Sequence, residues 1–239
     1  MTSRAELVAQ AQREDVISKK LDSRFVVRVM LLGGVFGPVC FAAAVLIGSA
    51  LRPGYDDRMQ VMSVLGESGS ANAMLMNGLG FQVTGLLIMA FAFALHQVAP
   101  RSLWSIVGGM LLAVFGGGII SAGIYSCDPG CLGTGTSRDA FLHIVVSAIA
   151  FTSGILACFV WGAAFRRDSA WRSLTIFSWL AGLLAAWLLF AFNSTSGTDS
   201  SPGLWQRLFI GSLFGWCAVV GIYSFRLAAS ASTVTNATE

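Results

Sequence analysis

The sequence predicts an all-α polytopic membrane protein, a bundle of six transmembrane helices with both termini in the cytoplasm. Its 239 residues are 55% hydrophobic and only 11% charged, whereas a soluble domain carries about 25% charged residues. Six intervals of the sequence contain no charged residue. Their length matters because a spanning helix needs roughly 20 apolar residues. The intervals cover residues 29–51, 68–100, 102–127, 140–165, 173–198 and 208–225. They are continuously apolar rather than alternating, which excludes a β-barrel.

The basic residues determine the predicted orientation. With the N-terminus inside and six crossings, 11 of the 15 Lys and Arg residues lie on the cytoplasmic side and 4 lie outside. The positive-inside rule favours this arrangement. We therefore expect a multi-pass protein of the plasma (inner) membrane. The first interval is longer than the roughly 7–15 apolar residues of a signal peptide, so we expect a retained helix.

Three segments follow from this pattern. Residues 1–25 are expected to form a cytoplasmic tail or a short surface helix, residues 26–226 the six-helix transmembrane domain, and residues 227–239 a disordered cytoplasmic tail. The helices are expected at residues 26–51, 73–96, 101–125, 138–165, 170–193 and 202–226.

Turn and capping residues set the helix boundaries. Pro53-Gly54 ends the first helix, and Asn72 is a candidate N-cap for the second. A short interfacial helix is expected between them, over residues 58–65. Pro100 precedes the third helix, and Ser137 or the threonine before it is expected to cap the fourth. Ser201 followed by Pro202 starts the sixth helix in the same way.

Small residues recur every four positions along two of the helices. Such spacing lets helix backbones approach closely in lipid. We expect the third and fourth helices to pack together through these faces, and a homo-oligomer formed through them is the alternative. The positions are Gly109, Ala113, Gly117 and Ser121 in the third helix, and Ala150, Gly154, Cys158 and Gly162 in the fourth.

The segment CDPGC places Cys127 and Cys131 around a proline and a glycine. A tight turn there brings the two sulfurs together, and a disulfide is expected outside the cytoplasm. A redox pair is less consistent with three intervening residues. A metal site that adds Asp128 and His143 remains open, because cysteine, histidine and aspartate are all zinc ligands.

A polar cluster is expected near the outer membrane surface. His143 lies about one turn into the fourth helix, and Asp128 lies at the exit of the third. Such a pair can serve acid–base chemistry, with Ser63 as a nucleophile or ligand. A purely structural network is the alternative, in which His143 bonds a carbonyl and Asp128 caps a turn. Candidate ligand-binding residues around this cluster are Glu67, Asn72, Asn77, Gln82 and Ser147.

The order of these motifs resembles a known family. RPGYDD, then SVLGESGSANAMLMN, a glycine-rich third span ending in CDPGC, and a histidine entering the fourth helix are similar to a family of bacterial and archaeal membrane proteins. That family is known as a domain of unknown function and is distantly like the Frag/DRAM/Sfk membrane proteins. The likeness covers residues 26–226, and it implies the six-helix fold and a shared outer polar site but no reaction. The recurrent positions that it implies for this site are Ser63, Gly66, Asn77, Asp128 and His143.

Three functions remain open at this point. The first is an outer pocket that binds a lipid or another amphipathic ligand. The second is a hydrolase or transferase that acts on lipid headgroups through Asp128 and His143, and the third is a small transporter. We expect membrane lipids as partners, no nucleic acid and no cofactor. Haem is excluded because His96 and His143 lie near opposite ends of spans, roughly 30 Å apart.

Overall fold

A computed structural model describes residues 23–131, 135–195 and 200–236, and this part of the chain is all-α, as predicted. Residues 23–31 are helical and turn at Leu32 into the first complete helix. The elements are α2 (Gly33–Ala50), η1 (Met62–Gly66), η2 (Leu75–Val83), α3 (Thr84–Val98), α4 (Leu103–Ile124), α5 (Arg138–Phe165), α6 (Ser173–Thr195) and α7 (Pro202–Asn236).

Six of the described helices are long and apolar enough to cross a membrane, with η2 and α3 forming one continuous span. Each of them corresponds to one predicted span, so the six-helix prediction is confirmed. The expected interfacial helix is a 3₁₀ turn, η1, which starts four residues later than predicted. The second span begins with nine residues in wide π-type turns, which the sequence did not predict.

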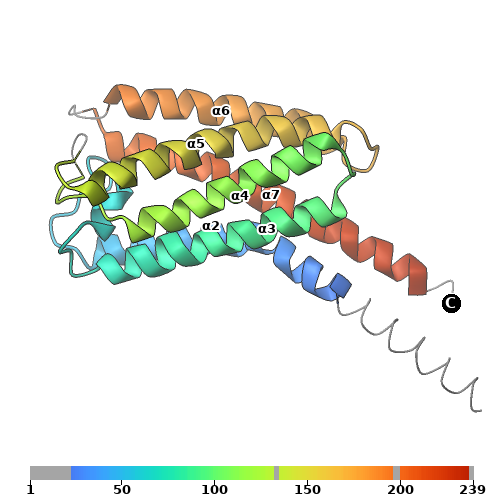
Figure 1. Cartoon of the computed structure of the whole chain (residues 1–239), viewed down its shortest axis with the longest axis horizontal. Coiled ribbons are helices and arrows are strands. Elements are labelled where there is room, and N and C mark those ends of the chain that lie inside the picture. Colours follow the sequence, from blue (N-terminus) through green and yellow to red (C-terminus); the bar gives the residue numbers. More distant parts are fainter. Residues whose placement is uncertain (1–22, 132–134, 196–199, 237–239) are drawn as a thin grey trace, which may run out of the picture.

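The six helices lie side by side in one bundle (Figure 1), and their contacts close them into a ring. Each helix packs against the next one in the chain, and α7 packs back against α2. At one end of the ring, α2 and α4 end while α5 and α7 begin; we call this the loop end. At the opposite end, α3 and α5 end, and the C-terminal part of α7 leaves the bundle.

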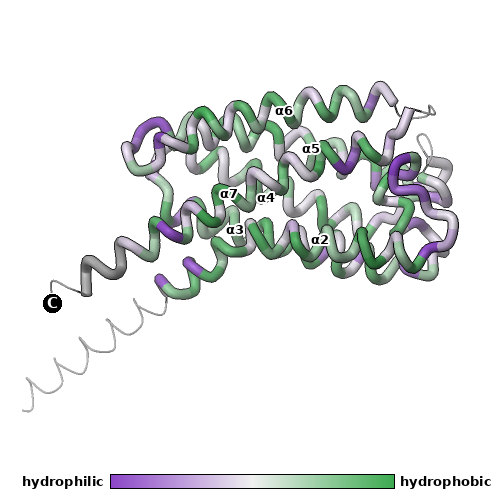
Figure 2. Tube along the Cα trace, turned by 180° about the vertical axis from the view of Figure 1, so that it is seen from behind, coloured by the Kyte–Doolittle hydropathy of each residue, from purple (hydrophilic) through white to green (hydrophobic). Residues whose placement is uncertain are grey.

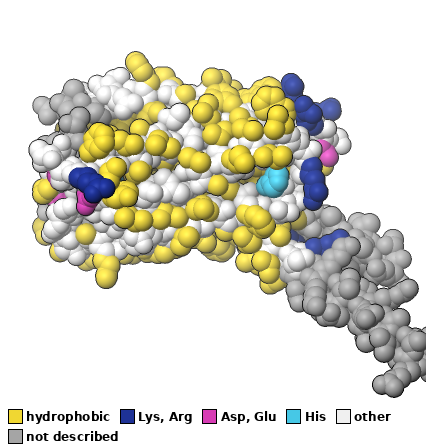
Figure 3. Space-filling model, in the orientation of Figure 1, with side chains coloured by type: hydrophobic (Ala, Val, Ile, Leu, Met, Phe, Trp, Pro, Cys, Tyr) yellow, Lys and Arg dark blue, Asp and Glu magenta, His cyan; other side chains and the backbone are white. Residues whose placement is uncertain are grey.

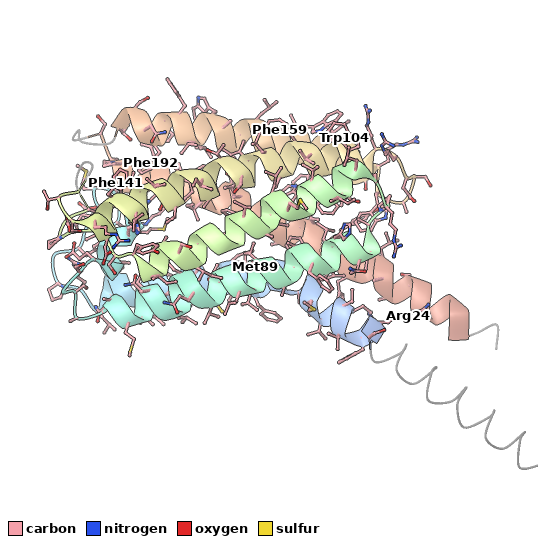
Figure 4. All side chains as sticks on the ribbon, in the orientation of Figure 1. Arg24, Met89, Trp104, Phe141, Phe159 and Phe192 are labelled. Carbon is pink, nitrogen blue, oxygen red and sulfur yellow. A yellow bond between two sulfur atoms is a disulfide. The ribbon has the colours of Figure 1, made fainter. Side chains whose placement is uncertain are left out.

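Hydrophobic residues predominate along the helices between the two ends of the ring (Figure 2), and hydrophobic side chains lie exposed over the face seen in Figure 3. Leu46 on α2 and Met110 on α4 are 70% and 64% exposed, as lipid-facing residues should be. Figure 4 labels Phe141 near the loop end and Trp104 near the opposite end, and both lie on this apolar surface. Charged side chains gather at the two ends of the bundle (Figure 3). This distribution is that of an integral membrane protein.

Glycines set the closest approach between neighbouring helices. A Cβ atom on Gly116 of α4 would lie 2.7 Å from the carbonyl oxygen of Gly85 on α3. On the side of α4 that faces α5, a Cβ on Gly118 would lie 2.6 Å from the Cβ of Ala150. The third and fourth spans, α4 and α5, therefore pack tightly, as expected. Gly117, however, which belongs to the predicted small-residue face, has nothing within 4 Å of its Cβ position.

The two ends of the chain were expected to lie outside the bundle. α7 remains helical through Asn236, well into the segment 227–239 for which disorder was expected. Of the predicted N-terminal segment 1–25, residues 1–22 lie outside the part of the chain that the structure describes.

Candidate functional site

The loop end of the bundle is crossed by η1, whose backbone is held by polar side chains from other elements. The backbone N–H of Met62 donates to Oε1 of Gln206 on α7, at 2.7 Å. Arg52, which follows α2, donates from Nη1 to the carbonyl oxygen of Val64 at 2.5 Å. A 3₁₀ turn leaves backbone groups unpaired at its ends, and these contacts satisfy them.

Asn77 holds the other end of η1. Its Nδ2 atom donates to the carbonyl oxygen of Gly66 at 2.9 Å and to Oγ of Ser126 at 3.0 Å. A Cβ on Gly66 would lie 2.1 Å from Oδ1 of Asn77, so only glycine allows this approach. Asn77 lies in the π-type segment η2, and such segments are frequent at functional sites.

Ser63 of η1 and His143 of α5 form the central contact of the site. Nδ1 of His143 lies 3.0 Å from the carbonyl oxygen of Ala122 and 2.7 Å from that of Tyr125. Carbonyl oxygens only accept, so Nδ1 carries the proton of the neutral ring. Nε2 is then an acceptor, and the hydroxyl of Ser63, 3.1 Å away, donates to it. His143 is buried, with 7% of the residue's surface exposed.

Glu67 is a buried carboxylate with two partners. Nη2 of Arg52 donates to its Oε1 at 2.6 Å, and the backbone N–H of Gly130 donates to its Oε2 at 2.5 Å. The guanidinium compensates the buried charge, and the second bond fixes the turn after α4. Glu67, predicted as a ligand-binding residue, therefore joins two loops.

Cys127 and Cys131 form the predicted disulfide. Gly130 adopts φ +84° within the bridged turn, a conformation that glycine adopts readily. The carbonyl oxygen of Cys127 accepts a hydrogen bond from the N–H of Ser68 at 2.9 Å. The bridged turn is therefore bonded to the segment that follows η1.

Asp128 points toward the start of α5. Its Oδ2 accepts hydrogen bonds from the N–H of Thr136 at 2.7 Å and the N–H of Ser137 at 3.0 Å, and also from the Thr136 hydroxyl. Bonds from Ser137 and Thr136 lower the pKa of Asp128 far below its ordinary range. Ser137 caps α5 as predicted, accepting from the N–H of Ala140. Among the described contacts, none joins Asp128 to His143, because its carboxylate is occupied by the N–H groups ahead of α5.

A second ion pair attaches the loop after α2 to α7. Arg207 donates to Oδ1 of Asp57 at 2.7 Å and to the hydroxyl of Tyr55 at 2.8 Å. Burial raises the pKa of Tyr55, against the opposing effect of the Arg207 cation. Arg207 also donates to the carbonyl oxygen of Gln60 at 3.0 Å. The segment before η1 is thus fixed to α7.

A cavity lies next to η1 inside the ring of helices. Aromatic side chains form much of its wall: Phe41 contacts Phe81 edge-on at 5.8 Å between ring centroids and Phe214 at 5.2 Å. The volume open to the centre of a water molecule is about 30 Å³, and about 10–15 Å³ suffices for one water. The polar side chains of the lining are Ser63, Ser147 and Gln206.

The other predicted ligand-binding residues lie elsewhere. The carbonyl oxygen of Asn72 accepts from the N–H groups of Leu75 and Met76, so this residue starts the second span. Gln82 is half-buried and lies against α4 near Gly123. Of the five predicted residues, Ser147 is therefore the one that lines the cavity.

Two polar residues of the site were not predicted. Gln206 and Arg52 both hold η1, yet each stands near the end of an apolar span, where polar residues are common. One feature of the sequence could have indicated Gln206: it is a polar residue just inside the apolar last span.

The metal alternative finds no support in the donor set. Within residues 23–131, 135–195 and 200–236, no group of three or more His, Cys, Asp or Glu side chains is placed to hold an ion. Both cysteines of the expected site are joined to each other.

The fold and the apolar surface define an integral membrane protein with six spanning helices. Residues 35–223 match the model of a family described as "Protein of unknown function (DUF998)". The match covers most of the chain, and the protein belongs to this family, in agreement with the resemblance that the sequence motifs indicated. No curated protein and no solved structure matches the chain.

Proposed function

We propose that this protein binds an amphiphile of the lipid class at the loop end, with the apolar chain in the cavity next to η1. The observation that carries the proposal is the lining of this cavity. Its walls are mainly aromatic and aliphatic, and its polar groups are Ser63, Ser147 and Gln206. Ligand sites in proteins combine apolar walls with a few polar groups in this way.

The size of the cavity restricts what enters it. About 30 Å³ accommodates a few atoms, so a complete acyl chain requires movement of the surrounding side chains. Met62 of η1 and the rings of Phe41 and Phe81 border the space. We infer that η1 shifts when a chain enters and that the polar end of the ligand remains near Ser63.

We further propose that the loop end faces away from the cytoplasm in the plasma membrane. The division of basic residues, 11 against 4, supports this orientation, and so does the disulfide. Two exposed positions at opposite ends test it. Arg58→Cys should react with a membrane-impermeant maleimide on intact cells, whereas Ser169→Cys should react only after lysis. The reverse pattern contradicts the orientation.

Binding is tested with a lysophospholipid that carries a diazirine near the end of its acyl chain. Photolysis of the purified protein should attach the probe to residues of the cavity wall, identified by peptide mass spectrometry. Ile119→Trp fills the cavity from α4 and should reduce this labelling at least threefold. Val114→Trp, on the lipid-exposed face of the same helix, is the control and should not.

The labelling of the two tryptophan variants can be compared only if both variants fold as the parent does. Both variants should elute as the parent does in size-exclusion chromatography and unfold at a similar temperature. Equal labelling of the cavity wall in the two tryptophan variants contradicts the proposal. Labelling confined to lipid-exposed residues such as Val114 contradicts it as well.

A further inference from the structure

We propose that Ser63 and His143 are a nucleophile and its general base, and that they cleave the carboxylic ester of an acyl amphiphile. This inference rests on the proposed function, because the cavity beside Ser63 is where the acyl chain would lie. It also assigns a reaction, which binding alone does not require.

The first support is the hydrogen-bond geometry of the imidazole. A serine becomes a nucleophile when a base accepts its proton and a third group orients that base. Here Nε2 of His143 accepts from Oγ of Ser63 at 3.1 Å. The carbonyl oxygens of Ala122 and Tyr125 hold Nδ1–H and so fix the tautomer that leaves Nε2 unprotonated.

The second support is that η1 is already anchored without this pair. Its backbone is bonded by Gln206, Arg52 and Asn77. The Ser63–His143 contact joins two side chains instead, and it satisfies no backbone group of η1. Anchoring of η1 therefore does not explain why the imidazole lies beside Ser63, a half-buried hydroxyl in the wall of the cavity.

The reaction follows from the positions of these atoms. Oγ of Ser63 attacks the ester carbonyl carbon while its proton moves to Nε2 of His143. The C–O bond of the ester then breaks, the leaving alcohol takes the proton from Nε2, and the acyl group remains on Ser63. Water attacks this acyl group and gives its proton to Nε2. The acid is released when the proton returns to Oγ, so both residues are regenerated.

Gln206 supplies a donor for the negative oxygen that develops during the attack. Its Oε1 accepts from the N–H of Met62, so the other terminal atom is the amide nitrogen, which only donates. Gln206 lines the cavity together with Ser63. A side-chain amide in this role contributes strongly to acyl transfer in other folds.

A fluorophosphonate probe tests the pair, because it modifies an activated serine with loss of fluoride. The full-length parent in detergent should be labelled on Ser63, as located by peptide mass spectrometry. Ser63→Ala should abolish this labelling, and His143→Ala should slow it about 100-fold or more. Ser121→Ala is the control, because this hydroxyl bonds the carbonyl oxygen of Gly117 within its own helix and should leave labelling unchanged.

His143→Gln is a second variant in case His143→Ala does not fold. Its amide can still donate to the two carbonyl oxygens but cannot accept and pass on the proton as the imidazole does. It should therefore unfold near the temperature of the parent while labelling remains slow. The same preparations should release fatty acid from a lysophospholipid only when both Ser63 and His143 are present.

The outcomes separate this inference from the binding proposal. Photolabelling of the cavity without fluorophosphonate modification of Ser63 would overturn the nucleophile assignment and leave binding standing. Modification of Ser63 at the same rate in His143→Gln would overturn the role of the base. Modification of Ser63 without photolabelling of the cavity would support the pair and refute the chain-binding site.

Discussion

Substitution of one glycine where α3 and α4 cross should destabilise the bundle, whereas the same change at the next residue should not. A Cβ added at Gly116 would lie 2.7 Å from the carbonyl oxygen of Gly85 and 2.8 Å from Cγ of Met89. Contacts this short with a backbone atom force the two helices apart. A Cβ at Gly117 meets nothing within 4 Å.

The two substitutions share every effect except this collision. Each replaces glycine with alanine inside a helix, which favours the folded state by up to about 1 kcal/mol. Gly116→Ala adds the cost of an overpacked interface, about 1–3 kcal/mol. The difference between the two variants should therefore be about 1–3 kcal/mol, since the gain in helix propensity cancels.

Unfolding in detergent micelles by increasing SDS, followed by tryptophan fluorescence, measures this difference. The parent, Gly116→Ala and Gly117→Ala should give one transition each, with only the Gly116→Ala midpoint shifted to lower SDS. If Gly116→Ala is as stable as Gly117→Ala, the close approach of α3 and α4 is refuted.

Three further predictions concern the loop end. The folded state lowers the pKa of Asp128 from 3.8, so its stabilising effect is present above that pH and is lost as the pH falls below it. Asp128→Asn should therefore flatten the acid side of a plot of unfolding temperature against pH, and an unchanged slope would contradict the assignment. Gln206→Ala leaves the N–H of Met62 without its partner and should cost about 1–3 kcal/mol in the SDS assay; an unchanged midpoint would argue against this bond. Replacing Cys127 and Cys131 by serine opens a short loop and should cost about 2 kcal/mol. Dithiothreitol should lower the parent to the level of that double variant but leave the variant itself unchanged.

The number and limits of the spans could be predicted because bilayer thickness and the cost of buried charge act on every residue of a span. Helix capping could also be predicted, because it depends on local sequence: the hydroxyl of Ser137 stands just before a helix and accepts from its first turn. The helical state of residues 227–236 was not readable, because polar composition alone does not exclude a helix that continues from a span.

Composition could not predict which side of each helix packs against its neighbours and which side faces lipid. Residues around α4 are apolar on all sides, so no amphipathic asymmetry distinguishes the side that faces α3 from the side that faces lipid. The predicted face through Gly117 is therefore one residue, about 100° of rotation, away from both Gly116 and Gly118, which make the contacts. The π-type turns of η2 were equally invisible, since they change hydrogen-bond spacing without changing hydropathy.

At the candidate site, the residue types were easier to predict than their partners. Ser63 and His143 were expected in one polar cluster, and they meet because η1 crosses the loop end. Asp128 was predicted beside the imidazole, yet it bonds the N–H groups of Thr136 and Ser137, which lie nearer in the chain and need an acceptor. Local backbone demands thus decide where a short carboxylate points.

The 35 residues of α7 would extend about 52 Å at 1.5 Å per residue, well beyond a hydrocarbon core of about 30 Å. Its last turns therefore form a projecting arm, and Arg28 lies 5.4 Å from the ring centroid of Phe225 where the first helix runs beside it. A soluble domain fused to this arm in continuous helical phase would add mass for particle alignment in electron cryomicroscopy without touching the opposite end.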